Sequence, residues 1–144
     1  MTETTTGSDT AGGAKTADKV FAYLAALLVL CVIVQFFLAG LGVWGIDQHK
    51  IGDAKQLDAH RGFAGAVALV AILMFITALI SRTSKTRIWV SILIAVLAEV
   101  VQSLLASGGE HQHWVGGLHV IDGLIILGLA GWMHRDSRAL LKRG

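Results

Sequence analysis

Four long apolar stretches, separated by short polar segments, dominate the hydropathy pattern of the chain. They cover residues 20–46, 63–80, 88–109 and 114–133. The first two contain no Asp, Glu, Lys or Arg, whereas the third contains Glu99 and the fourth contains Asp122. A membrane-spanning helix needs about 20 predominantly apolar residues. The pattern therefore predicts an all-α protein, a four-helix transmembrane bundle.

The polar ends and the composition agree with this prediction. Residues 1–19 are rich in Thr, Ser, Gly and Ala and are predicted to form a disordered tail, and residues 134–144 form a basic tail after the membrane domain of residues 20–133. The chain is 54% apolar and 15% charged, against about 45 to 50% and about 25% in soluble domains. This composition excludes a disordered, collagen-like or nucleic-acid-binding protein, and the single cysteine, Cys31, excludes a disulfide framework.

Basic residues are distributed unevenly between the two predicted sides of the membrane. Nine of the twelve Lys and Arg residues lie before the first span, between the second and third, or after the fourth, and three lie on the other side. Cytoplasmic segments carry an excess of Lys and Arg. We therefore predict that both termini are cytoplasmic. The absence of proline fits four uninterrupted helices.

A short repeat relates the two halves of the chain. Residues 34–40, VQFFLAG, match residues 101–107, VQSLLAS, and each segment is followed by a loop and then by a histidine, His60 or His119. The chain is thus predicted to consist of two repeated helical hairpins, each with a Gln before its loop and a His after it. Parallel repeats place equivalent residues at equal depth in the membrane. His60 and His119 are then expected to face one another near the outer surface.

Two opposed histidines in a helical bundle suit a haem iron whose axial positions are both filled by imidazole. Small residues such as Gly65 and Gly123 lie close to the histidines and could leave space for the macrocycle. Arg61, together with Lys50 and Lys55 in the loop, could reach the haem propionates. The alternative is that His60 only caps its helix and that the glycines pack helices against one another.

These motifs resemble one four-helix half of the haem A synthase family. Gln102, the small residues up to Gly109 and the following His119 look like the third and fourth helices of that half, and the pair His60-Arg61 is similar to the pair that opens its second helix. The resemblance implies a b-type haem bound through His60 and His119. The family enzyme has two such bundles and this chain has one, so haem A synthesis itself is not predicted. A weaker similarity is to the membrane anchors of succinate dehydrogenase.

Other polar residues leave further roles open. Glu99, close to the middle of its span and on the same helix face as Gln102, suits a proton relay, a quinone contact or a carboxyl hydrogen-bonded to a neighbouring helix. Asp122 could orient a ligand or stay neutral against Gln35. A second metal site, for zinc or copper, could be formed by a set of loop residues. That set is His49, Glu110, His111 and His113.

We therefore expect an integral protein of a bacterial cell membrane that binds haem b and transfers electrons near the outer face. Its expected partners are the lipid bilayer and a quinone or a redox protein, with no nucleic acid. The competing hypothesis is a non-enzymatic accessory or assembly subunit of a larger membrane complex or homo-oligomer. The residues do not distinguish an enzyme from an electron carrier.

Overall fold

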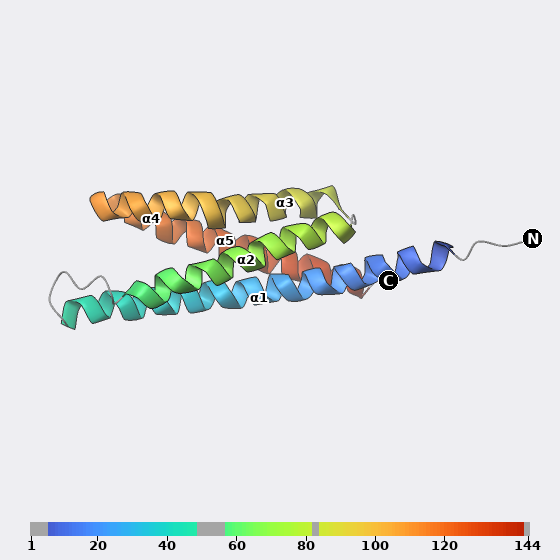
Figure 1. Ribbon diagram of the computed structural model, residues 1–144, viewed down its shortest axis with the longest axis horizontal. Coiled ribbons are helices and arrows are strands. Elements are labelled where there is room, and N and C mark those ends of the chain that lie inside the picture. Colours follow the sequence, from blue (N-terminus) through green and yellow to red (C-terminus); the bar gives the residue numbers. More distant parts are fainter. Residues whose placement is uncertain (1–5, 49–56, 82–83, 143–144) are drawn as a thin grey trace, which may run out of the picture.

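The computed structural model describes residues 6–48, 57–81 and 84–142, and these form a bundle of long helices (Figure 1). The elements follow one another along the chain with short connections. They are α1 (Thr6–Gln48), α2 (Asp58–Ser81), α3 (Lys85–Val96), the π-helical turn η2 (Leu97–Val101), α4 (Gln102–His111) and α5 (His113–Leu141). The all-α prediction is confirmed for these described ranges.

Four spans of the described chain are long and apolar enough to cross a membrane. They are Lys15–Trp44, Asp58–Ser81, Lys85–His111 and His113–Leu141. Only 11 to 28% of the most apolar window in each span is buried inside the protein. Most of the apolar surface of these spans is therefore on the outside of the bundle. A soluble protein would bury such surface, whereas membrane-spanning helices expose it to lipid. The chain is therefore an integral membrane protein, as its hydropathy predicted.

The third span contains one departure from regular α-helix. The turn Leu97–Val101 between α3 and α4 is π-helical, with Glu99 inside it. A π turn needs no proline, because it arises when one extra residue is accommodated in a helical turn. The third span is nevertheless one helix from Lys85 to His111, so the four spans are continuous as predicted and the π turn is a local irregularity.

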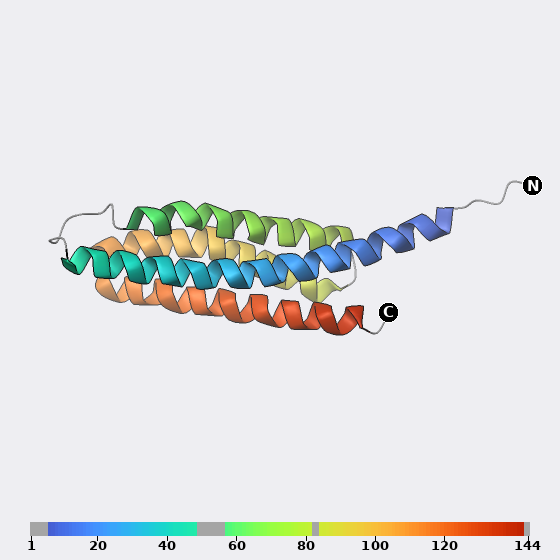
Figure 2. The same cartoon turned by 90° about the horizontal axis from the view of Figure 1, so that it is seen from below.

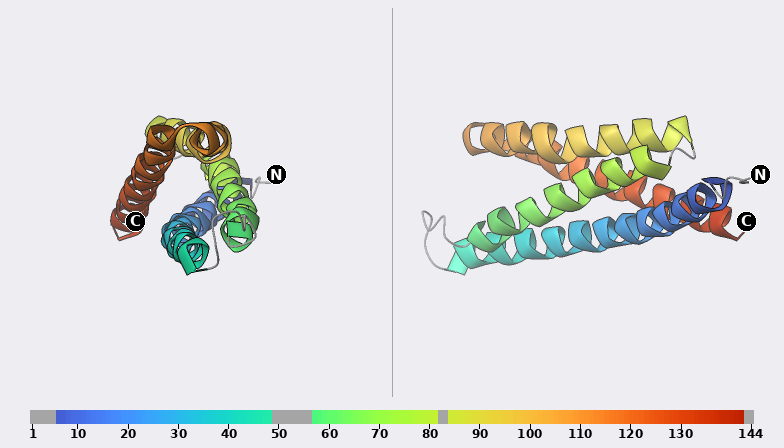
Figure 3. Two further views of the ribbon diagram at one scale, coloured as in Figure 1. Left: turned by 90° about the vertical axis from the view of Figure 1, so that its left-hand side faces the viewer. Right: turned by 45° about the vertical axis from the view of Figure 1, so that its right-hand side comes forward.

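The four spans form two hairpins that lie against each other. Helix α1 packs against both α2 and α5, α4 packs against α5, and α3 packs mainly against α2. Within the described residues α2 and α5 share no packed stretch, so they occupy one diagonal of the bundle (Figure 3). Both termini lie at the same end of the bundle (Figures 1 and 2). This arrangement agrees with four crossings of a membrane.

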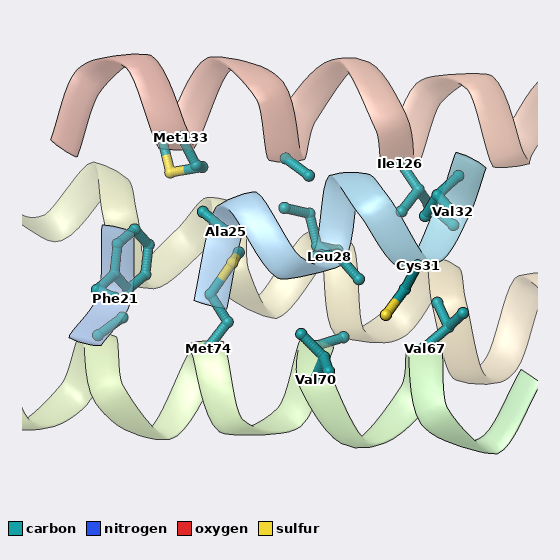
Figure 4. Packing of buried hydrophobic residues seen from close by; sticks show 14 residues of the cluster. Phe21, Ala25, Leu28, Cys31, Val32, Val67, Val70, Met74, Ile126 and Met133 are labelled. Carbon is teal, nitrogen blue, oxygen red and sulfur yellow. The ribbon is translucent and has the colours of Figure 1, made fainter. Parts of the chain in front are cut away.

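The hydrophobic core occupies the middle of the bundle and the half that carries the termini. Phe21 and Leu28 of α1, Met74 of α2, and Ile126 and Met133 of α5 are almost fully buried there (Figure 4). The histidines of the repeat lie beyond this cluster, toward the opposite end. The site is therefore outside the best-packed part of the protein.

The structure differs from the sequence predictions at both chain ends. Helix α1 begins at Thr6 and therefore includes most of the segment that was expected to be disordered, and α5 continues to Leu141, well past residue 133. Asp18 and Asp136, one from each of these extensions, both bind Arg87 of α3. These ion pairs fasten α1 at Asp18 and α5 at Asp136 to α3, whereas the first turns of α1 project beyond the bundle (Figure 1). Composition does not reveal these contacts.

Arg87 is the most deeply buried charged side chain in the described residues, with a relative exposure of 1%. Its Nη1 lies 2.8 Å from Asp18 Oδ1 and its Nε lies 3.3 Å from Asp136 Oδ2. The guanidinium also lies 5.3 Å from the centre of the Phe21 ring, within the range of a cation–π contact. Arg87 therefore connects α1, α3 and α5. The sequence analysis treated it only as a charge that sets topology.

Helices α4 and α5 approach closely because only Gln112 separates them. A Cβ added to Gly109 would lie 2.9 Å from the Gly116 Cα, and one added to Gly108 would lie 2.8 Å from Val115 Cγ1. The first contact is with backbone, which cannot rotate away. Gly109 is therefore required by helix packing, whereas the contact at Gly108 is with a side chain.

We expect Gly109→Ala to destabilise the protein by about 1 to 3 kcal/mol, because the added methyl group forces α4 away from α5. The matched control is Gly128→Ala on α5, where a Cβ meets nothing within 4 Å. That variant should be as stable as the parent or more stable, since alanine favours a helix over glycine by about 0.5 to 1 kcal/mol. Denaturant titration in detergent measures both changes. Equal stability of the two variants would contradict the close approach.

Candidate functional site

A pair of reciprocal hydrogen bonds joins the helices of each hairpin at the end opposite the termini. In the first hairpin, Gln35 Nε2 donates to the His60 carbonyl at 2.9 Å, and His60 Nδ1 lies 3.1 Å from the Gln35 carbonyl oxygen. In the second, Gln102 Nε2 donates to the His119 carbonyl at 3.1 Å, and His119 Nδ1 lies 3.2 Å from the Gln102 carbonyl oxygen. The same arrangement thus occurs twice, as the repeat predicted.

These bonds follow from the chemistry of polar groups inside an apolar bundle. A helical carbonyl oxygen has two lone pairs, and the backbone bond of the helix uses one of them. Each Gln amide and each imidazole therefore satisfies its N–H on a carbonyl of the antiparallel partner helix. In this environment an unsatisfied polar group is costly. The residues must then lie at equal depth, since both bonds form only when Gln and His are level.

The carbonyl partners also determine the protonation of the two rings. A carbonyl oxygen only accepts hydrogen bonds, so Nδ1 of His60 and of His119 carries the proton. In a neutral imidazole the lone pair is then on Nε2, the nitrogen that can bind a metal. Metal-ligating histidines commonly donate their other N–H to a backbone carbonyl or a carboxylate. A neutral ring with this hydrogen bond therefore has the tautomer that a metal ligand requires.

The two histidines meet across the diagonal between α2 and α5. Their ring centroids are 6.1 Å apart and the ring planes are inclined at 71°. Imidazole nitrogens bind first-row metals at about 2.0 to 2.1 Å, so rings on opposite sides of one metal ion have centroids about 6 Å apart. The spacing between His60 and His119 is close to the value for one shared metal ion, and it also lies within the range of direct edge-to-face ring packing.

The number of protein donors indicates which kind of metal centre could fit. Nowhere in the described residues does a group of three or more His, Cys, Asp or Glu side chains converge. A protein zinc site needs three or four such ligands. Haem iron needs only the axial ligands, because the macrocycle supplies the rest. Two facing histidines with no further donors therefore suit haem better than a bare ion.

The same observation applies to the predicted second metal site. Glu110, His111 and His113 lie at the α4–α5 junction, where they do not form a converging group of donors. His49 lies outside the described residues. The structure therefore adds no support for a zinc or copper site here.

The two glycines predicted beside a cofactor have different surroundings. A Cβ at Gly65 would meet nothing within 4 Å, so α2 is open there. At Gly123 a Cβ would lie 3.1 Å from Phe36 Cζ and 3.4 Å from Gln102 Nε2, so these side chains already fill the space. Phe36 would have to turn away before a flat ring could lie against Gly123.

A shallow surface depression next to Phe36 lies on α1 at the same end of the bundle. Its volume is about 380 Å³ and its lining is almost wholly apolar. The lining residues form one face of α1: Phe36, Ala39, Gly40, Val43 and Trp44. This face begins one residue after Gln35, which binds the backbone of His60. No residue of α2 or α5 lines this depression, so it does not reach between the two histidines.

Arg61 was predicted to reach haem propionates, and the structure shows its current partner. Arg61 Nη2 lies 3.4 Å from Glu110 Oε1, and both side chains are at least half exposed. The pair connects α2 of the first hairpin to α4 of the second at the end of the bundle opposite the termini. An exposed ion pair of this kind contributes only about 0 to 1 kcal/mol. Arg61 can therefore exchange the Glu110 carboxylate for another carboxylate at little cost in free energy. Lys50 and Lys55 lie outside the described residues.

Of the two predicted intramembrane carboxylates, Asp122 lies in the polar cluster around the histidine pair and Glu99 lies in the π turn. Asp122 is 5% exposed and its carboxyl group interacts with the Gln102 amide. Among the described residues, its Oδ2 and the Oε1 of Gln35 lack hydrogen-bond partners. Glu99 lies in the π turn, three residues before Gln102, and its carbonyl oxygen accepts a bond from Ser103 Oγ at 2.6 Å. Asp122 therefore belongs to the polar cluster around His119.

Sequence reasoning missed two polar features at the end that carries the termini. One is the Arg87 ion cluster described above. The other is His134, whose Nδ1 lies 3.0 Å from the Ala22 carbonyl oxygen. A signal for the first feature was present, because Asp18, Arg87 and Asp136 are predicted at the same membrane surface. Nothing in their spacing shows that the three side chains meet.

The fold and the site define a four-helix membrane bundle with paired histidines between its hairpins. The chain belongs to a family of unknown function, DUF6220, which matches residues 35–110, more than half of the chain. The match includes Gln35, His60 and Gln102 and ends before His119. No curated protein and no solved structure matches the chain. The resemblance to haem A synthase, and the weaker one to succinate dehydrogenase anchors, thus remain predictions from short motifs.

Proposed function

We propose that this protein binds one b-type haem between His60 and His119 and exchanges electrons near the outer face of a bacterial cell membrane. The observation that carries the proposal is the doubled Gln–His arrangement. It leaves both Nε2 atoms available in rings whose centroids are 6.1 Å apart. One Gln–His pair per hairpin is enough to fasten each hairpin, whereas the proximity of the two rings is not needed for that role.

The chain's own residues would hold and orient the group. His60 and His119 provide the axial nitrogens, and the Gln35 and Gln102 carbonyls keep each ring in the ligating tautomer. Gly65, where an added Cβ would meet nothing within 4 Å, would leave room for the macrocycle beside α2. Arg61 is close enough to the end of the bundle opposite the termini to pair with a propionate in place of Glu110. A bound haem would supply a one-electron iron couple.

The proposed orientation rests on the basic residues. The end that carries the termini also holds Lys19, Lys85, Arg135 and Arg138, whereas Arg61 is the basic residue described at the other end. The excess of positive charge supports cytoplasmic termini. The histidine pair then lies toward the outer face, where a quinone or a redox protein would be the electron partner. One haem near one surface does not by itself connect the two sides of the membrane.

A reduced-minus-oxidised optical spectrum tests the proposal directly. Protein purified from a host with adequate haem supply should show sharp low-spin haem bands, with about one haem per chain because there is one pair of axial ligands. Reconstitution of the apoprotein with added haem serves as a second route. Absence of the bands by both routes would overturn the haem proposal. It would then favour the accessory-subunit hypothesis, in which the Gln–His bonds only fasten each hairpin.

A further inference from the structure

A hollow lies between α1 and α5 at the end that carries the termini, far from the histidine pair. These helices run side by side there (Figure 2). The hollow has a volume of about 530 Å³. Its lining residues come from one face of each helix: Lys19, Ala22, Tyr23 and Ala26 of α1, and His134, Arg138 and Leu141 of α5.

The charged part of this hollow is cationic. Lys19 and Arg138 approach it from the two helices, and neither has an ion-pair partner within the described residues. The nearby carboxylates of Asp18 and Asp136 are already bound to Arg87. Arg87 balances one of these two carboxylates, so Lys19, Arg138 and the ion cluster together keep one net positive charge.

On α1 the lining changes from cationic at Lys19 to mainly apolar at Ala22 and Ala26 in the direction of the membrane interior. Ala22 and Ala26 lie one and two helical turns from Lys19, and their short side chains leave a channel beside Tyr23. On α5, His134 lies one turn further into the bundle than Arg138, and its ring is held by the Ala22 carbonyl. A ligand in this hollow would thus meet two cations at one end, and two alanines together with His134 at the other.

We propose that this hollow binds an anionic phospholipid, with its phosphate between Lys19 and Arg138 and an acyl chain along Ala22 and Ala26. Basic pockets between transmembrane helices at the cytoplasmic surface recognise anionic headgroups. A soluble phosphate could use the two cations but would gain nothing from the alanine channel. The proposal does not depend on haem binding, because the hollow shares no residue with the histidine site.

Native mass spectrometry of the detergent-solubilised protein, titrated with phosphatidylglycerol or phosphatidylcholine, tests this assignment. The parent protein should retain phosphatidylglycerol in preference to phosphatidylcholine. The double variant Lys19→Gln/Arg138→Gln should bind phosphatidylglycerol about 30-fold more weakly, from the usual contribution of two basic residues near an anionic headgroup. The matched control Lys85→Gln/Arg135→Gln removes the same charge from exposed positions outside the hollow and should bind as the parent does.

Two further measurements separate the lipid from its headgroup. Ala26→Leu keeps both cations but fills the channel, so it should also weaken phosphatidylglycerol binding. Millimolar inorganic phosphate should raise the melting temperature less than phosphatidylglycerol does. The assignment is overturned if the parent binds both lipids equally, if the two double variants lose affinity equally, or if Ala26→Leu binds phosphatidylglycerol as the parent does. It is also overturned if phosphate stabilises the protein as much as phosphatidylglycerol does.

Discussion

Replacing either His60 or His119 with alanine is expected to abolish the low-spin haem spectrum of the purified protein. Each substitution removes one of the two axial nitrogens, and the described residues contain no third donor that converges on the site. The remaining histidine could at most hold iron from one side, so the sharp reduced bands should disappear. Haem content per chain and the reduced-minus-oxidised spectrum measure the change.

The control is His134→Ala, which removes a histidine with the same kind of backbone hydrogen bond at the other end of the bundle. Its haem content should equal that of the parent. Added imidazole provides a second readout, because a free ring can occupy the cavity left at residue 60 or 119 and restore a low-spin spectrum. Such rescue separates lost ligation from lost folding. Bands that persist in both single variants would refute the ligand assignment.

Replacing Arg87 with methionine is expected to cause the largest loss of stability among the substitutions proposed for this protein. Removing one partner of a buried ion pair costs about 3 to 5 kcal/mol, because the remaining charge is left without compensation. Here two carboxylates, Asp18 and Asp136, lose their shared cation. The side chain of Asp136 is 40% exposed, so water can solvate its unpaired carboxylate and reduce the loss of stability. We therefore expect a value at the lower end of that range. Denaturant titration in detergent measures the loss.

Two comparisons make this prediction specific. The triple variant Arg87→Met/Asp18→Asn/Asp136→Asn removes all three charges and should regain much of the lost stability, since replacing a whole buried ionic group is often nearly neutral. Arg61→Met breaks the exposed pair with Glu110 and should cost only about 0 to 1 kcal/mol. If Arg87→Met and Arg61→Met have equal effects, Arg87 does not hold the three helices together.

Much of the architecture could be predicted from the sequence because a membrane imposes strong rules. Apolar stretches of sufficient length must become helices, since the bilayer offers no partner for unpaired backbone groups. The prediction of two repeated hairpins was confirmed, since Gln35 and Gln102 make the same bonds to His60 and His119 in the two hairpins. The boundaries were less accurate: α1 and α5 extend beyond the apolar stretches because their polar ends bind Arg87.

The candidate site could be predicted in identity but not in geometry. His60, His119, Gln35 and Gln102 were all selected from sequence, yet their mutual bonds depend on the depth at which antiparallel helices align. Gly65 and Gly123 were predicted to play equal parts, but Phe36 of a different helix lies against Gly123 and nothing lies within 4 Å of a Cβ at Gly65. Such contacts between distant segments are not encoded in local spacing.

The sequence by itself determined that this chain crosses a membrane four times as two related hairpins, because hydrophobic length and a local repeat are properties of the chain alone. Only the tertiary structure decided that His60 and His119 meet at 6.1 Å across the diagonal and that Arg87 is enclosed by Asp18 and Asp136. The physical reason is that side chains far apart in sequence are brought together by helix packing. Packing depends on the shapes of all the facing side chains at once.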